Sequence, residues 1–261
     1  NLINTVRVPE DCGTLTEAVR RVERVTRVDE GRNLKTIVLS RAGRHVWGND
    51  ICIASSMNII GAPGIAKEDI VVDGGICVDV RDTNRSDVHL QHMTIRNGGI
   101  RAMSSFTMED VIVEQCRGCG VYASGTGTVG TCTNVEVRRC GHSGVVAAGG
   151  ALITLAGPKT TVRDNCTRGC KNEIVYIWDT VCLGMVDMWT NLKKTSSCGE
   201  KSKQYPLHTR TGDWRTRSHP RKECDIGDAG LQVWTSPEGC VDATIQLVHP
   251  LTKETVATNN G

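Results

Sequence analysis

A four-residue phrase recurs along this chain, and the recurrence constrains the fold more than any other feature. Residues 99–102 read Gly-Ile-Arg-Ala, residues 120–123 read Gly-Val-Tyr-Ala, and residues 144–147 read Gly-Val-Val-Ala. The copies lie 21 residues apart (99 to 120) and then 24 residues apart (120 to 144). Self-similarity with a period in the low twenties is typical of repeat proteins, in which each repeat stacks on the previous one.

Apolar residues alternate in step with this phrase. The alternating pairs are Met93 and Ile95, Val111 and Val113, and Val135 and Val137. Because side chains alternate between the two faces of a strand, we predict that these pairs, together with Val121 and Val145, point into the interior. The residues between the pairs are Thr94, Ile112 and Glu136, and we expect them to face water.

The chain has 13 cysteines, an odd and high number. Cys116 and Cys119 form one CxxC motif, which could have a metal or redox role, but cysteine also serves as a small buried apolar residue. A column of Gly98, Cys116, Cys140 and Cys166 follows the repeat. Strand spacing would place the Cα atoms of Cys116 and Cys140 ~5 Å apart, within disulfide range. We nevertheless predict free thiols, because stacked side chains run parallel.

The remaining pattern predicts one helix followed by many short strands. Thr14 and Glu17 form a capping box, and a helical face follows that contains Leu15, Ala18, Val19, Val22 and Val25. Short β-branched segments bounded by Gly, Pro or Asn occupy residues 35–40, 57–61, 69–75, 89–99 and 107–116. The chain has a single Phe, which suits thin layers of aliphatic residues better than one large globular core. A β-sandwich would also have short strands, but it would not repeat one phrase in register.

Several segments resemble a known superfamily. "CGTLTEAVRRV" resembles the helix that caps the first coil of right-handed parallel β-helices, the pectin-lyase-like superfamily, and "VHLQHMTIRNGG" resembles one of their coils. "SSFTMEDVIVEQC", "CTNVEVRRCGHSGV" and "TIQLVHPLTKETV" resemble β-helix proteins of unicellular algae and large algal viruses. The resemblance covers about 5–170 and 228–261. It implies an all-β fold, a right-handed parallel β-helix (solenoid) with an N-terminal capping helix.

The repeat pattern is interrupted at 171–226. This stretch lacks the recurring phrase, which returns as Gly-Leu-Gln-Val at 230–233, and it holds three of the five tryptophans. Residues 193–222 contain nine Lys or Arg and two acidic residues. We therefore predict a single β-helix domain over 1–261, with an insertion at 171–226. The insertion is either an elaborated loop or a non-native segment.

The resemblance implies carbohydrate chemistry, because the superfamily includes lyases, hydrolases and epimerases as well as non-catalytic adhesins. A polysaccharide lyase needs a base next to a uronate carboxylate, and positive charge or Ca²⁺ to neutralise that carboxylate. Lys159, Arg163 and Asp164 lie close together in "GPKTTVRDN" and could recognise an anionic sugar, or could form an ordinary solvated edge. His142 in "CGHSG" is similar to a Gly-His-Gly motif of β-helix hydrolases, but the companion acidic motifs are absent.

Asp79, Asp82 and Asp87 are the candidate calcium ligands. Three carboxylates within nine residues could bind Ca²⁺, although Asp is also a common turn residue. We favour the turn, so no cofactor is firmly expected.

Three functions remain open from the sequence. The first is a non-catalytic scaffold or binding module that contacts glycans or proteins at a surface or in a virion. The second is a polysaccharide lyase or related carbohydrate-active enzyme, and the third is a structural subunit that assembles end to end through its C-terminal coil. A net charge of +2 argues against a nucleic-acid binder, and no apolar run approaches the ~18 residues of a membrane span. We favour the first function, because no complete catalytic set assembles.

Overall fold

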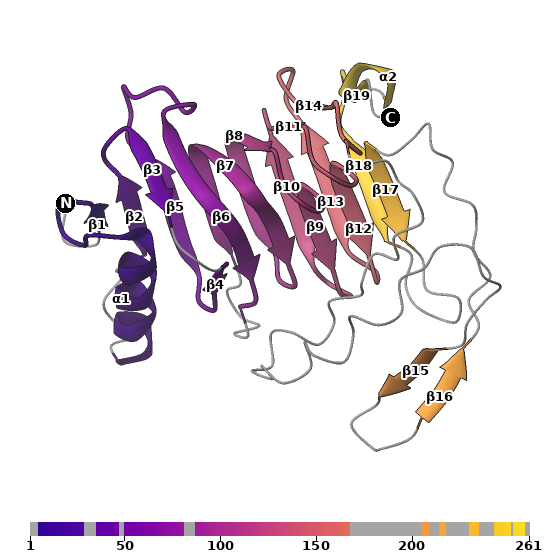
Figure 1. Cartoon of the computed structure of the whole chain (residues 1–261), viewed down its shortest axis with the longest axis horizontal. Helices are drawn as coiled ribbons and strands as arrows, with labels where there is room; N and C mark the ends of the chain where they lie inside the picture. Colours follow the sequence, from indigo (N-terminus) through magenta and orange to yellow (C-terminus); the bar gives the residue numbers. More distant parts are fainter. Residues whose placement is uncertain are drawn as a thin grey trace. The chain divides into compact units, whose positions relative to one another are not determined.

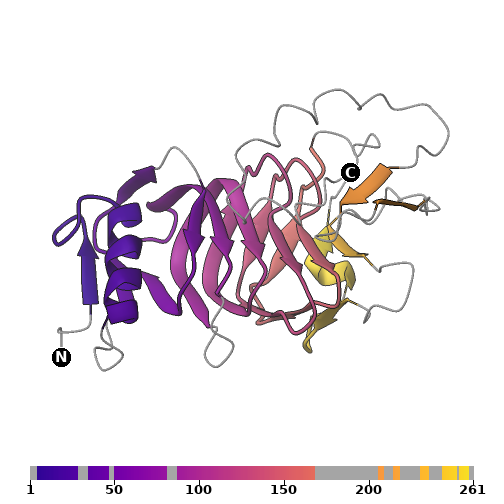
Figure 2. The same cartoon turned by 90° about the horizontal axis from the view of Figure 1, so that it is seen from below.

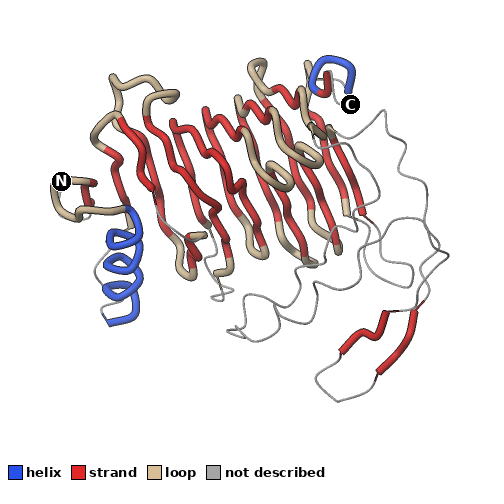
Figure 3. Tube along the Cα trace, in the orientation of Figure 1, coloured by secondary structure: helices blue, strands red, loops and turns tan. Residues whose placement is uncertain are grey.

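A computed structural model describes residues 5–28, 35–46, 50–80, 87–167, 205–208, 214–217, 230–234, 243–251 and 253–258. The described chain is mostly parallel β-sheet with few helices, as predicted (Figure 3). The chain divides into two compact units. One consists of residues 1–169 together with 227–261, and the other of residues 170–226.

The first unit contains one 17-stranded sheet, whose parallel pairings fall into three runs of neighbouring strands (Figures 1 and 2). The first run consists of β1 (Thr5–Val8), β2 (Thr36–Leu39), β5 (Met57–Gly61), the start of β7 (Val88–Ala102), the start of β8 (Phe106–Glu114), β10 (Val129–Thr133), β13 (Leu152–Ala156) and β18 (Thr244–Leu247). The second run consists of β3 (Gly43–Val46), the start of β6 (Ile70–Val78), the middle of β7, the end of β8, β11 (Glu136–Arg138), β14 (Thr161–Arg163) and β19 (Ala257–Thr258). The third run consists of β4 (Ile51–Ile53), the ends of β6 and β7, β9 (Val121–Ser124), β12 (Val145–Ala148) and β17 (Leu231–Trp234).

The recurring phrase forms the third run. Val121 pairs with Ile100 on one side and with Val145 on the other, and Val145 pairs with Leu231. Glycine, the first residue of the phrase, accepts a hydrogen bond from the preceding copy: Ile100 N donates to Gly120 O and Val121 N donates to Gly144 O, each at 2.8 Å. The phrase therefore recurs because each copy lies directly beside the next, as the sequence predicts.

Glycine is required in this phrase by close approach. A Cβ atom built on Gly120 would lie 2.4 Å from Cγ1 of Val137 and 2.7 Å from Gly144 O. A Cβ atom on Gly144 would lie 2.4 Å from Cγ1 of Val162. Any larger residue at these positions would collide with the core of the same repeat or with the backbone of the next.

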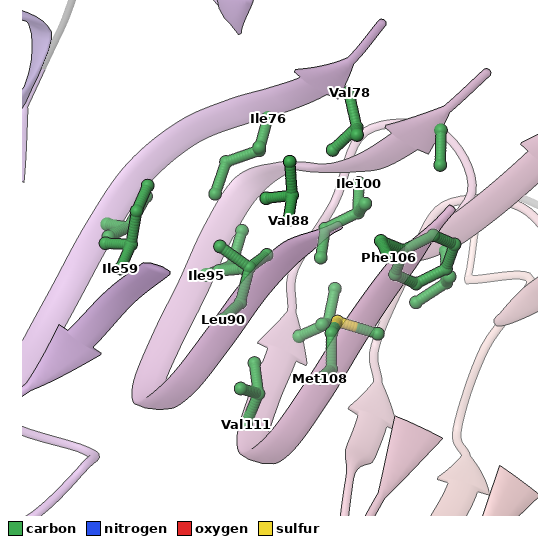
Figure 4. Packing of buried hydrophobic residues seen from close by; sticks show 14 of the residues in the cluster. Ile59, Ile76, Val78, Val88, Leu90, Ile95, Ile100, Phe106, Met108 and Val111 are labelled. Carbon is green, nitrogen blue, oxygen red and sulfur yellow. The ribbon is translucent and has the colours of Figure 1, made fainter. Parts of the chain in front are cut away.

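The predicted inward residues form the core (Figure 4). Six valines are at most 1% exposed: Val111, Val113, Val121, Val135, Val137 and Val145. The single phenylalanine, Phe106, is also buried, and its ring lies where Gly130 of β10 has no side chain. Aliphatic side chains thus fill most of the interior, which explains the low aromatic content.

Two of the residues expected to face water are buried instead. Thr94 and Ile112 are each 1% exposed, whereas Glu136 is partly exposed as predicted. The hydroxyl of Thr94 donates a hydrogen bond to Lys67 O at 2.9 Å. The segment that contains Lys67 therefore covers the outer side of the second run at Thr94. The alternation pattern could not reveal this second layer of contact.

Helix α1 (Leu15–Val28) packs against β1 and β2 at the N-terminal end of the sheet (Figure 1). The predicted capping box forms in part: Glu17 N donates to Oγ1 of Thr14 at 3.2 Å, but Oε2 of Glu17 accepts from Gly13 N at 3.1 Å, one residue before the backbone NH of Thr14 that the motif would use. The predicted helical face is buried from Leu15 to Val22. The short α2 (Lys253–Val256) precedes β19. Neither described helix has the length and apolarity needed to cross a bilayer.

Residues with a left-handed backbone conformation recur at both ends of the second run. His92 and Asp110 have φ of 55° and 52°, and they lie opposite one another, because their flanking residues pair in register. Asn134 takes the same conformation before β11. Asn97, Gln115, Arg139 and Asp164 do so at the other end. Non-glycine residues adopt this conformation rarely, so its repetition indicates that the chain turns at equivalent points in successive repeats.

The described part of the second unit is an antiparallel pair, β15 (Tyr205–His208) with β16 (Trp214–Arg217). The rest of the predicted insertion, 171–226, lies outside the described residues. Whether the first unit folds without the insertion stays a prediction.

Candidate functional site

The outer side of the second run carries a cluster of charged side chains. Its members are Arg96, Glu114, Glu136, Arg138, Arg163 and Asp164, and we call it the ion-pair ladder. Strand register produces it, because Glu114 pairs with Arg96 on one side and Arg138 on the other. Arg138 in turn pairs with Arg163. Outward residues of neighbouring strands lie close enough to form such cross-strand ion pairs.

Each carboxylate in the ladder binds at least one guanidinium. Glu114 accepts from Nη2 of Arg96 at 2.5 Å and from Nη2 of Arg138 at 2.8 Å. Glu136 accepts from Nη1 of Arg138 at 2.9 Å and from Nη2 of Arg163 at 2.5 Å. Asp164 accepts from Nη1 of Arg163 at 2.7 Å. Three guanidinium groups and three carboxylates therefore neutralise one another.

The pairing fixes the protonation states of the ladder. Burial alone would raise the pKa of Glu114, whose side chain is 4% exposed, but the hydrogen bonds from Arg96 and Arg138 outweigh burial and lower that pKa. The hydrogen bonds that Arg163 donates to the Glu136 carboxylate raise the pKa of Arg163. Proton transfer at neutral pH requires a group whose pKa lies near the working pH. Glu114, Arg138 and Arg163 have the opposite property, because their pKa shifts favour the charged form.

Of the sequence-predicted catalytic residues, the structure brings Arg163 and Asp164 together. Lys159 is exposed in the turn before β14, where its backbone NH donates to Oδ1 of Asn134 at 3.3 Å. His142 is partly exposed in the turn before β12, and its backbone NH donates to Gly118 O at 3.1 Å. Lys159 thus lies in the turn from the first run to the second, between β13 and β14, and His142 lies in the turn from the second run to the third, between β11 and β12.

The predicted calcium ligands lie between β6 and β7 in the sequence. Asp79 is partly exposed, and its backbone NH donates to Ile53 O at 3.0 Å. Asp87 is exposed, and Asp82 lies outside the described residues. Within the described ranges, no group of three His, Cys, Asp or Glu side chains is placed to hold a metal ion.

A second polar cluster, which the sequence did not indicate, consists of His92, Asp110 and Lys67. Lys67 Nζ lies 2.5 Å from Oδ1 of Asp110, and Nδ1 of His92 lies 2.7 Å from Oδ2. The other ring nitrogen of His92 lies 2.8 Å from Ile65 O. Because both ring nitrogens face acceptors, the arrangement favours the imidazolium, and the hydrogen bonds to Ile65 O and to Asp110 raise the pKa of His92. These contacts hold the segment 65–67 against β7 and β8 where the two strands bend, at His92 and Asp110.

The thiols of Cys116 and Cys140 are neighbours, as the repeat predicts. Both are buried, and each donates to a backbone oxygen at 3.6 Å, Cys116 to Glu114 O and Cys140 to Arg138 O. The contact with Cys140, together with burial, raises the pKa of Cys116 well above its usual range. Burial alone raises the pKa of Cys132 in β10 to about 12. A nucleophilic or metal-binding cysteine needs an accessible thiolate, so these environments favour packing over reactivity.

A comparison of the chain with protein-family models, curated proteins and solved structures finds no match.

Proposed function

We propose that this chain is a right-handed parallel β-helix that serves as a non-catalytic scaffold or binding module. The strand pairings support the β-helix, because β7 runs through all three runs in turn and later strands repeat the same order. Each turn of such a helix would bury its inward residues against the next. The outer faces of the three runs would then be the surfaces that meet a partner.

The ion-pair ladder carries the non-catalytic part of this proposal. A lyase site needs a base and a cation that are both available to the substrate. Arg163 and Asp164, the adjacent charged pair that the sequence offers, bind one another, and Arg163 also binds Glu136. A uronate carboxylate would have to displace these bonds. The ladder therefore acts as a cross-strand brace for β7, β8, β11 and β14.

Ultraviolet absorbance tests this function directly. A lyase creates an unsaturated sugar end that absorbs in the ultraviolet, whereas a scaffold does not. We expect no growth of absorbance when the protein is incubated with pectate or alginate, with and without Ca²⁺. Absorbance that grows with protein concentration, and that disappears in the Arg163→Ala variant, would replace the scaffold with a lyase.

Unpaired strand edges favour a second candidate, a subunit that assembles end to end. Within the described residues β17, β18 and β19 each pair on one side, with β12, β13 and β14. Unpaired edges invite another strand. Light scattering over a range of protein concentrations tests this candidate: a mass that rises with concentration supports assembly, and a constant monomer mass rejects it.

A further inference from the structure

The outer side of the first run is built differently from that of the second. Six successive strands, from β2 to β13, place an uncharged hydrogen-bonding side chain at the same outward position: Thr36, Asn58, His89, Thr107, Thr131 and Thr154. All six are partly exposed. Parallel strands lie ~4.8 Å apart, so these groups form a regular column, which we call the threonine column.

Apolar side chains flank the threonine column on both sides. Val38 and Ile60 lie on one side of the column, and Val129 and Leu152 lie on the other. Among the described residues the exposed large hydrophobic side chains are Val129, at 41%, and Val248, which follows β18, at 39%. Both belong to this face, which therefore leaves apolar surface open beside a row of hydroxyl groups.

The outer side of the first run differs in charge from the ion-pair ladder. Between β2 and β13 the outward positions of the first run include one charged side chain, Glu109, which accepts a hydrogen bond from Gln91. An uncharged partner has no charged group that must lose its water when it binds this face. A polyanion has such groups and would gain no ion pair there. The contrast between the two faces selects a neutral partner.

We propose that the threonine column is the binding surface for a neutral polysaccharide. Threonine presents a methyl and a hydroxyl group together, and a neutral sugar ring presents apolar CH faces and a hydroxyl rim. A chain laid across the strands meets this pair of groups at four of the six strands, and the amide of Asn58 and the imidazole of His89 at the other two. This proposal deepens the proposed binding function by naming the class of ligand and the face that takes it, and it rests on that function.

Retention on insoluble polysaccharides tests the surface. We expect the intact protein to be retained on at least one of cellulose, chitin and mannan, and to remain bound in 1 M NaCl, because screening by salt weakens ionic contacts only. The double variant Thr107→Lys/Thr131→Lys places two long charged side chains in the column and should bind at least tenfold more weakly. Gln115→Lys adds one lysine at an exposed turn outside the face and should bind as the parent does.

A milder variant guards against loss of folding. Thr131→Val keeps the shape and removes one hydroxyl, so circular dichroism should match the parent while retention falls by a few-fold. No retention on any neutral polysaccharide, retention on pectate or alginate instead, or retention unchanged in the double variant would each overturn the proposal. None of these outcomes changes the absorbance expected in the ultraviolet assay. Failure of the binding surface can therefore be distinguished from failure of the non-catalytic function.

Discussion

The imidazole Nδ1 of His92 lies 2.7 Å from Oδ2 of Asp110, its neighbour on the adjacent strand segment, and both residues have left-handed backbone conformations. Lys67 binds the other oxygen of the same carboxylate. One acid thus holds two cations that come from different parts of the chain. The contact joins the bend after the first run to a segment more than 20 residues earlier in the sequence.

This contact predicts a pH dependence of the free energy of unfolding. The folded-state pKa of His92 is raised, so its contribution is fully present below the unfolded pKa of ~6.5 and is lost as the pH rises through the folded pKa. The pKa of Asp110 is lowered, so its contribution is present above its unfolded pKa of ~3.9 and is lost as the pH falls through its folded pKa. With both side chains about a third exposed, the pair stabilises the fold by ~1 kcal/mol or less.

Urea unfolding at a series of pH values, for the parent and for His92→Gln, isolates this effect. Burial lowers the pKa of His45, which acts in the opposite sense, so the difference between the two proteins is the informative quantity. That difference should shrink above pH 7. A difference that stays constant from pH 5 to pH 9 would show that His92 does not titrate in the contact. His89→Gln, in the threonine column, is the matched control.

Glu114→Gln should destabilise the protein strongly. The change leaves Arg96 and Arg138 facing a neutral amide. The Glu114 side chain is 4% exposed, and breaking a buried ion pair costs about 3 kcal/mol. Glu136→Gln removes a carboxylate that also binds two arginines but is 21% exposed, and it should cost about 1 kcal/mol. Equal losses in urea unfolding would mean that burial does not set the strength of the ladder.

Gly120→Ala should destabilise the protein by ~1–3 kcal/mol, the usual cost of overpacking a core. The new Cβ would lie 2.4 Å from Val137 and 2.7 Å from the backbone oxygen of Gly144. Gly118→Ala is the control, because its nearest neighbour would be Cδ2 of His142 at 4.0 Å. Chemical denaturation of both variants checks the repeat register. A neutral Gly120→Ala would contradict the close approach of the strands.

Alkylation with iodoacetamide should distinguish the cysteines. Cys52 is exposed and should react in the native protein, whereas Cys132 is fully buried with a pKa of about 12 and should react after unfolding. Peptide mass spectrometry gives the extent of reaction at each site. The same spectra test the expected free thiols at Cys116 and Cys140, and a disulfide between the two would refute that expectation.

The sequence by itself determined which residues face inward and which copies of the repeat meet. Alternation has a strict period of two in a strand, so the inward positions of Val111 and Val113 follow from local pattern alone. The match between Val121 and Val145 follows from the recurring phrase, because the glycine that begins each copy allows the close approach. Helix α1 was equally predictable, since its cap and its apolar face are local features.

Only the tertiary structure decided which outward side chains meet. Arg96, Glu114, Arg138 and Arg163 are separated by 18, 24 and 25 residues, so no single period brings them into one row. The contact between Lys67 and Asp110 spans 43 residues and depends on where a connecting segment lies. Turn lengths vary from one repeat to the next without disturbing the inward pattern. Local pattern therefore fixes the side of the sheet to which a residue points, whereas the path of the whole chain fixes its neighbours there.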